Sequence, residues 1–221
     1  MKIILFGVTG MVGQGVLREC LLEPEITTVL VIGRTSLNQQ NEKLREIVIK
    51  DLYNLQPVED QLRNYDACLF CLGVSSTGMK EADYHHVTYD LTISVAQTLS
   101  KLNPEMTFIY VSGMGTDSTE IGRTMWARVK GKTENALLRL PFKAAYMFRP
   151  AFIQPMHGIK SKTKLYRLLY VLISPVTPIL TRFPKYATTT EKIGRAMIQV
   201  AKHGAPKPFL ESQDINTIGN S

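Results

Sequence analysis

The sequence has few of the residues that mark disulfide-rich, metal-binding or membrane-spanning proteins. It contains only three cysteines and four histidines among 221 residues. A small, odd number of thiols is typical of a reducing compartment, so we expect a cytoplasmic protein. The sequence has no internal repeat, and no uninterrupted apolar run is long enough to cross a bilayer.

The sequence also lacks runs of basic residues and any recognised nucleic-acid motif, although its formal net charge is +7. The charge is unevenly spread: residues 1–116 hold 9 basic and 13 acidic residues, and residues 117–221 hold 17 and 6. This asymmetry indicates an anionic partner for the second half, such as a cofactor phosphate, an acidic substrate or a membrane surface. We do not expect nucleic acid as a partner.

No cysteine or histidine pattern predicts a metal site. Cys68 and Cys71 form a C-x-x-C pair, but residues 67–72 predict a buried strand, on which residues three apart face opposite sides. His85 and His86 lie early in a predicted helix, and no further ligands have a suitable spacing. We therefore expect the cysteines in the core and the histidines on a solvated helix face.

The start of the chain carries the strongest pattern in the sequence. Residues 3–6 are typical of a buried strand, and Gly7, Gly10 and Gly13 follow before an apolar helical pattern. Strand, glycine turn and helix form the context that binds dinucleotide phosphates, and the alternative is an ordinary strand-to-helix turn. Gly7 would make the tight turn, Gly10 would admit the pyrophosphate, and Gly13 would let the helix pack closely. The interruption by Gly7, Thr9 and Gly10 also argues against a signal peptide.

Further strands and helices alternate along the chain. This alternation predicts an α/β fold, a Rossmann-like doubly wound parallel sheet in one domain over 1–221, with 151–187 as a small C-terminal substrate-side or lid region. The predicted strands are 27–32, 46–50, 67–72, 106–111, 144–148 and 208–211, and the predicted helices are 57–63, 81–102, 123–140 and 188–203. A capping box, Thr188-x-x-Glu191, opens the last of these helices.

Ligands of such sheets bind at the carboxyl ends of the strands. Arg34 and Thr35 follow the second strand, where a cation attracts the 2′-phosphate of NADP and an acid would select NAD. We therefore expect NADP, with NAD as the alternative, unless Arg34 is only a solvated loop residue. Asp51 and Leu52 could hold the adenine, and Gly73 would let the chain pass close to the ribose.

Several segments resemble a known family over nearly the whole chain. They are GVTGMVG at 7–13, GR at 33–34, DL at 51–52, CLG at 71–73, VSG at 111–113, VKGKTE at 129–134, FRPA at 148–151 and FLESQDI at 209–215. By these segments the chain resembles the atypical short-chain dehydrogenases/reductases, especially the Tat-interacting-protein group and bacterial epimerase-like proteins. The resemblance implies an oxidoreductase or epimerase with a small-molecule substrate.

The motifs and the resemblance together predict a set of cofactor contacts. They are Gly7, Thr9, Gly10, Met11, Val12, Gly13, Arg34, Thr35, Asp51, Leu52, Cys71, Leu72, Gly73, Lys130, Arg149, Pro150, Ala151 and Phe152. The resemblance also implies Ser112 and Lys130 as catalytic residues. In the family a tyrosine one turn before the lysine transfers the proton, but this chain has Trp126 there, and an indole cannot act as a general acid or base.

The loss of the tyrosine leaves alternatives open. Tyr110 could replace it from the same strand face as Ser112, or a water held by Ser112 and Lys130 could do so. A second hypothesis is a non-catalytic, dinucleotide-bound regulatory or sensor protein. Residues 160–185 combine an apolar stretch with flanking basic residues, which predicts a lid or homodimer contact, or alternatively a peripheral membrane contact.

Overall fold

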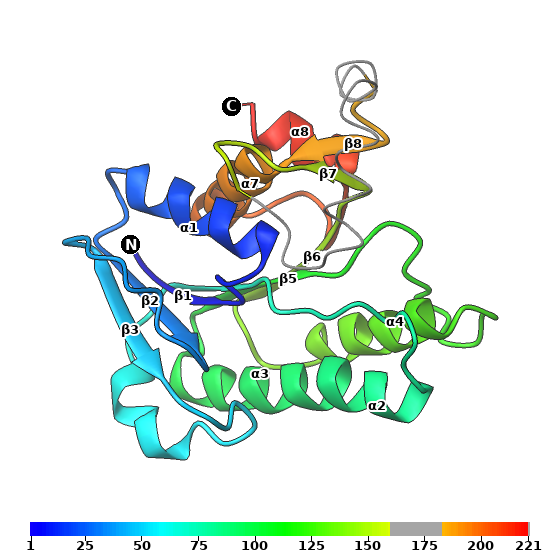
Figure 1. The fold of residues 1–221 in the computed structure, drawn as a ribbon, viewed down its shortest axis with the longest axis horizontal. Coiled ribbons are helices and arrows are strands. Elements are labelled where there is room, and N and C mark those ends of the chain that lie inside the picture. Colours follow the sequence, from blue (N-terminus) through cyan, green and yellow to red (C-terminus); the bar gives the residue numbers. More distant parts are fainter. Residues whose placement is uncertain (160–182, 221) are drawn as a thin grey trace.

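The computed structural model describes residues 1–159 and 183–220, which form a central parallel sheet with helices on both faces (Figure 1). The strand order is β3-β2-β1-β4-β5-β6-β9, and every adjacent pair is parallel. The strands are β1 (Lys2–Phe6), β2 (Thr28–Gly33), β3 (Leu44–Val48), β4 (Ala67–Phe70), β5 (Thr107–Val111), β6 (Ala144–Arg149) and β9 (Phe209–Glu211). The Rossmann-like doubly wound fold predicted from the alternating pattern is confirmed.

The central strands are apolar at almost every position because helices cover both faces of the sheet. All four residues of β4 and the last four of β1 are buried. The chain turns from one half of the sheet to the other between these two strands, since β1 pairs with β2 on one side and with β4 on the other. A ligand crevice is expected at the carboxyl ends of strands beside such a switch point.

Two helical layers sandwich the sheet (Figure 1). One layer holds α1 (Met11–Leu22), α7 (Thr190–His203) and α8 (Ser212–Ile218), whose apolar residues share a core with one face of β1, β2 and β4. The other layer holds the 3₁₀ helix η1 (Gln56–Leu62), α2 (Glu81–His85), α3 (Leu91–Leu102) and α4 (Met125–Leu137). Cys68 and Cys71 contact these two different cores, as the strand geometry predicts.

The long helix predicted over 81–102 is present but contains a π-helical turn, η2 (His86–Asp90), between α2 and α3. The wider turn brings Asp90 to both preceding histidines: its carboxylate lies 3.3 Å from His85 Nδ1 and 3.1 Å from His86 Nδ1. The two histidines expected on a solvated helix face therefore both lie beside the Asp90 carboxylate. Such turns are frequent at functional sites.

Two local predictions need correction. The third strand is β3 (Leu44–Val48) rather than 46–50, because Leu44 is buried opposite Val29 at its start. The cap of α7 is Thr189, whose hydroxyl accepts from Lys192 N at 3.1 Å, so the predicted capping box at Thr188 is wrong.

Thr188 instead lies in β8 (Ala187–Thr189), which pairs in parallel with β7 (Phe152–Gln154) as a small second sheet. This sheet was not predicted, because three-residue strands leave too short a pattern in the sequence. The lid, dimer and membrane predictions for 160–185 fall, except for the last three residues, outside the described residues. Within 1–159 and 183–220 no helix is long and apolar enough to cross a membrane.

The packing of α1 on β1 gives a stability prediction. A Cβ on Gly13 would lie 2.2 Å from the Gly7 carbonyl oxygen, which is backbone and cannot move aside cheaply. We expect Gly13→Ala to lower the free energy of unfolding by about 2 kcal/mol or more, measured by urea denaturation. Gly73→Ala is the matched control, since a Cβ there meets nothing within 4 Å. Equal stability of the two variants would contradict this account.

Candidate functional site

The glycine turn between β1 and α1 has the geometry that its three glycines predict. Gly7 has φ +84°, and a Cβ on it would lie 2.5 Å from the backbone of Cys71 and Leu72. At Gly10 a Cβ would meet only the Gly7 carbonyl oxygen, at 3.3 Å. The protein's own packing therefore requires glycine at 7 and 13, whereas at 10 it leaves a small open approach to the backbone.

The helix that follows this turn starts with unsatisfied donors. Gly10 is the N-cap of α1, and among the described residues no side chain caps it and no acidic residue stands in its first turn. The first N–H groups of a helix have no partner within the helix, and the helix dipole places partial positive charge there. With the open approach at Gly10, the start of α1 fits the phosphates of a dinucleotide.

The chain after β2 and β3 forms the next part of this edge. Arg34 and Thr35 are exposed there, while the Ser36 hydroxyl donates to Glu46 Oε2 at 2.7 Å, and the Leu37 N–H donates to the other oxygen of Glu46 at 2.7 Å. Glu46 therefore fixes the loop that carries Arg34. No sequence pattern pointed to Glu46.

The predicted adenine side lies beside a ring stack. Tyr53 and His86 stack with ring centroids 4.7 Å apart, and the Tyr53 N–H donates to Asp51 Oδ1 at 2.9 Å. Burial raises the pKa of Tyr53, and the nearby charge of Arg34 opposes that rise. Leu52 is buried. Its contact with the adenine ring remains a prediction.

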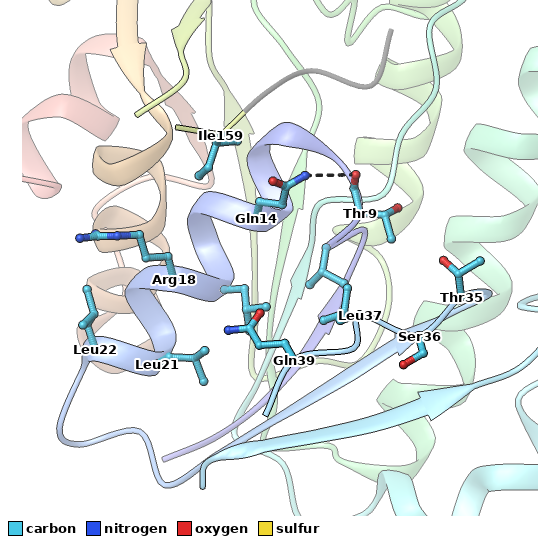
Figure 2. Close-up of a pocket in the computed structure, with 12 residues that line it drawn as sticks. Thr9, Gln14, Arg18, Leu21, Leu22, Thr35, Ser36, Leu37, Gln39 and Ile159 are labelled. Atoms are coloured by element: carbon cyan, nitrogen blue, oxygen red, sulfur yellow. Dashed lines mark hydrogen bonds between the residues drawn. The ribbon is translucent and has the colours of Figure 1, made fainter. Parts of the chain in front are cut away.

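A groove of about 610 Å³ runs from the glycine turn along the outer side of α1 (Figure 2). At one end lie Thr9 and Thr35, and Gln14 Nε2 donates to the Thr9 carbonyl at 3.4 Å. The leucines of α1 and Leu37 make the remainder mostly apolar. The groove thus joins the glycine turn to the loop after β2.

Ser112 directly follows β5, and its side chain is committed to a buried carboxylate. Its Oγ donates to Glu134 Oε1 at 2.5 Å. Glu134 is fully buried and also accepts from Arg149, with Arg149 Nε 3.0 Å from the same oxygen and a second nitrogen on the other. The Arg149 guanidinium lies 4.5 Å from the Phe209 ring centroid. The side chain of Arg149 is thus part of a buried ion pair at the carboxyl edge of the sheet.

Lys130 lies one turn before Glu134 on α4 and points at the same strand end. Its Nζ donates to the Ser112 carbonyl at 2.7 Å and to the Val111 carbonyl at 3.4 Å. Burial lowers the pKa of Lys130 to about 8, and the negative charge of Glu134 opposes the fall. The structure therefore brings Ser112 and Lys130 together, as their predicted roles require.

Two aromatic residues near this pair, Trp126 and Tyr110, differ in their surroundings. Trp126 packs on the loop after Ser112, since a Cβ on Gly115 would lie 3.6 Å from its Cη2. Tyr110 is 1% exposed, inside the core under α4, and burial raises its pKa far above the usual value. An enclosed phenol cannot reach a ligand, which argues against Tyr110 as a substitute proton donor.

The remaining predicted contacts lie on two segments of the carboxyl edge, one after β4 and one after β6. Cys71, Leu72 and Gly73 follow β4, and the Cys71 N–H donates to the Phe6 carbonyl at 3.1 Å. After β6, the Pro150 carbonyl accepts from Met114 N at 2.9 Å, and Ala151 N donates to Ser212 Oγ at 2.7 Å. These bonds fix the backbone at the carboxyl edge, and the contacts of residues 71–73 and 150–152 with a cofactor remain predictions.

Glu134, like Glu46, is a site residue that sequence reasoning missed. The sequence did contain a clue to its role. Glu134 stands four residues after Lys130, which places both side chains on the same face of the helix. The signal becomes specific only when Arg149 is known to lie opposite. In the described part of the chain, no group of three or more His, Cys, Asp or Glu side chains is placed to hold a metal ion.

Known proteins resemble this chain either in sequence or in fold. No family model matches it. A protein named FMP52, mitochondrial, from Meyerozyma guilliermondii is 24% identical over 214 residues, covering 91% of this chain and 85% of that protein. HTATIP2 from Rattus norvegicus is 24% identical over 154 residues, covering 69% of this chain and 62% of that protein.

Two solved structures show the same fold over most of the chain. Gre2 from Candida albicans in complex with NADPH has a TM-score of 0.70 at 13% identity, covering 95% of this chain and 77% of that one. The Bordetella bronchiseptica enzyme WbmF in complex with NAD+ has a TM-score of 0.67 at 14% identity, covering 99% of this chain and 77% of that one. At such low identities the likeness concerns the fold.

The predicted cytoplasmic location is contradicted by these relatives. The FMP52 proteins of Meyerozyma guilliermondii, Chaetomium globosum and Scheffersomyces stipitis are all named mitochondrial. The error has a physical reason: free thiols report a reducing environment, and that is not a property of one compartment.

The buried ion pair gives one stability prediction. Arg149→Met should keep the apolar contact with Phe209 but leave the Glu134 carboxylate buried without its partner. We expect a loss of about 3–5 kcal/mol in the free energy of unfolding, measured by urea denaturation. Arg139→Met, at an exposed position, is the control. Adding Glu134→Leu should recover most of the loss, and no recovery would contradict the ion-pair account.

Lys130 gives a prediction on pH. Its pKa is about 8 in the folded protein and 10.5 in its ordinary state, so between these values the unfolded chain binds more protons than the folded one. The stability of the wild type relative to Lys130→Met should therefore rise as pH increases through this window. Urea denaturation of both proteins across the window measures it. A difference that stays constant or falls would show that burial does not lower the pKa of Lys130.

Proposed function

We propose that this chain, which belongs to the atypical short-chain dehydrogenase/reductase group, binds a nicotinamide dinucleotide across the carboxyl edge of its sheet. The observation that carries the proposal is the uncapped start of α1 behind Gly7 and Gly13, with the backbone open at Gly10. Pyrophosphate oxygens would accept hydrogen bonds from the N–H groups there. Thr9, Met11 and Val12 border the same place.

NADP is the cofactor that the loop after β2 favours. Arg34 and Thr35 are exposed, and Glu46 holds the loop in place by accepting from Ser36 and Leu37. A guanidinium at this point would bind a 2′-phosphate with charge-assisted hydrogen bonds. Structures of similar fold carry NAD+, NADH or NADPH by their names, which supports the cofactor class and leaves NAD as the alternative.

The reaction we propose is hydride transfer to or from a small molecule, as an oxidoreductase or epimerase. The cofactor supplies or accepts the hydride when it is bound. Lys130 would carry positive charge beside the reacting oxygen, since it is anchored on the Ser112 carbonyl. Ser112 would contact the substrate. Two structures of similar fold contain UDP-glucose by their names, which supports a small-molecule substrate class without identifying it.

A second candidate function, a non-catalytic dinucleotide-bound regulatory or sensor protein, is favoured by the same site. Trp126 stands where the proton-transferring tyrosine is expected, and Tyr110 is enclosed in the core. The proton of Ser112 is donated to Glu134. Of these three candidate proton donors, the tyrosine at 126 is absent, Tyr110 is enclosed, and the Ser112 hydroxyl already donates its proton.

Calorimetric titration with NAD+, NADH, NADP+ and NADPH tests binding directly. Turnover is then sought in both directions, with NADPH and a panel of carbonyl compounds and with NADP+ and the matching alcohols. Turnover that Ser112→Ala abolishes would support the enzyme, and tight binding with no turnover would support the sensor. Silence in all four titrations would overturn both.

Arg34→Asp tests the choice of cofactor. The carboxylate should repel the 2′-phosphate and replace a charge-assisted contact, so we expect NADPH binding to weaken by about 1–3 kcal/mol, with little change for NADH. Calorimetry measures both, and Arg139→Asp, at an exposed position, controls for the general change in charge. Equal affinity of the wild type for NADH and NADPH would contradict the prediction.

A further inference from the structure

The Ser112 hydroxyl has one proton, and its surroundings decide where that proton points. Its Oγ lies 2.5 Å from Glu134 Oε1 and 3.2 Å from the Phe148 carbonyl oxygen. A carboxylate paired with an arginine only accepts hydrogen bonds, so a contact this short places the serine proton between the two oxygens. Towards any other neighbour, Ser112 then presents lone pairs alone.

Glu134 cannot turn away from this contact without losing several others. It is fully buried, and Arg149 holds both of its carboxylate oxygens. Arg149 is fixed in turn by the Phe209 ring and by Ser118, whose Oγ lies 2.5 Å from its Nη2. The serine is therefore held by a rigid, buried acceptor.

Lys130 lies beside Ser112 and is a hydrogen-bond donor, whereas Ser112 is an acceptor. Of its two carbonyl contacts only the one to Ser112, at 2.7 Å, is short, so the ammonium keeps donors for a ligand oxygen. The other groups facing it are the Tyr110 ring, 5.5 Å from Nζ to its centroid, and the Glu134 carboxylate on its own helix. The pair Ser112 and Lys130 thus offers one acceptor and one donor.

We propose that Glu134 is a positioning residue that holds Ser112 as an acceptor, so that Ser112 and Lys130 together select a ligand hydroxyl over a carbonyl. A hydroxyl donates one hydrogen bond and accepts another, which matches Ser112 and Lys130 together. A carbonyl oxygen only accepts, so it would leave the Ser112 lone pairs without a partner. This inference rests on the proposed function, because it takes the ligand to lie beside Ser112.

The test compares two fragments of similar shape, cyclohexanol and cyclohexanone, by ligand-detected NMR titration. Each is titrated into the protein alone and into the protein saturated with NADP+. We expect the wild type to bind the alcohol about fivefold more tightly, the value of one hydrogen bond. Glu134→Gln should lose this preference, since the neutral amide can donate to Ser112 and free its proton for a carbonyl.

Glu211→Gln is the matched control. Glu211 also faces Arg149, at 3.7 Å, but the structure gives it no contact with Ser112, so the alcohol preference should survive. If Glu134→Gln fails to fold by thermal melting, Ser112→Ala replaces it, and the preference should again disappear.

Several results would overturn the inference: no binding of either fragment, equal binding or a ketone preference in the wild type, or an alcohol preference that survives in Glu134→Gln or Ser112→Ala. An alcohol preference in the protein alone, with no nucleotide bound in calorimetry, would keep the inference and reject the proposed function.

Discussion

The close approach of three backbone segments at the end of β1 determines the rest of the site. Gly7, Gly13 and the chain leaving β4 come so near to one another that a Cβ on Gly7 would lie 2.5 Å from the Cys71 backbone. Because side chains are excluded there, α1 begins directly over the sheet at its switch point, with its N–H groups pointing outward. The carboxyl ends of β2, β4, β5 and β6 then lie around that helix start.

Most of this architecture could be predicted because its signals are local. Apolar runs mark strands buried on both faces, and the glycine spacing marks the turn after Ile3–Phe6. The parts that escaped prediction depend on contacts distant in sequence. The pairing of β7 with β8 cannot be read from two three-residue segments. Thr189 rather than Thr188 caps α7, because the strand runs through Thr189 and the helix begins only at Thr190.

The candidate site divides in the same way. Backbone features such as the start of α1 follow from residue types alone, so their positions were predicted well. The side-chain network did not follow, because the partner of Glu134 lies 15 residues away on β6. Arg149 illustrates the difference: its sequence context suggested a cofactor contact, whereas its guanidinium lies in a buried ion pair that orients Ser112 from beneath.

This division separates the predicted phosphate contacts from Trp126, which stands where the family resemblance predicts a tyrosine. The part of the site that would bind phosphates consists of backbone donors and glycines, which do not depend on the side chain at 126. The part that would perform chemistry consists of Ser112, Lys130 and Glu134, which hold one another through bonds of 2.5 and 2.7 Å. The tryptophan in place of the expected tyrosine therefore bears on the second part only. The Ser112–Glu134–Arg149 network belongs to this second part, and its contacts do not involve the side chain at 126.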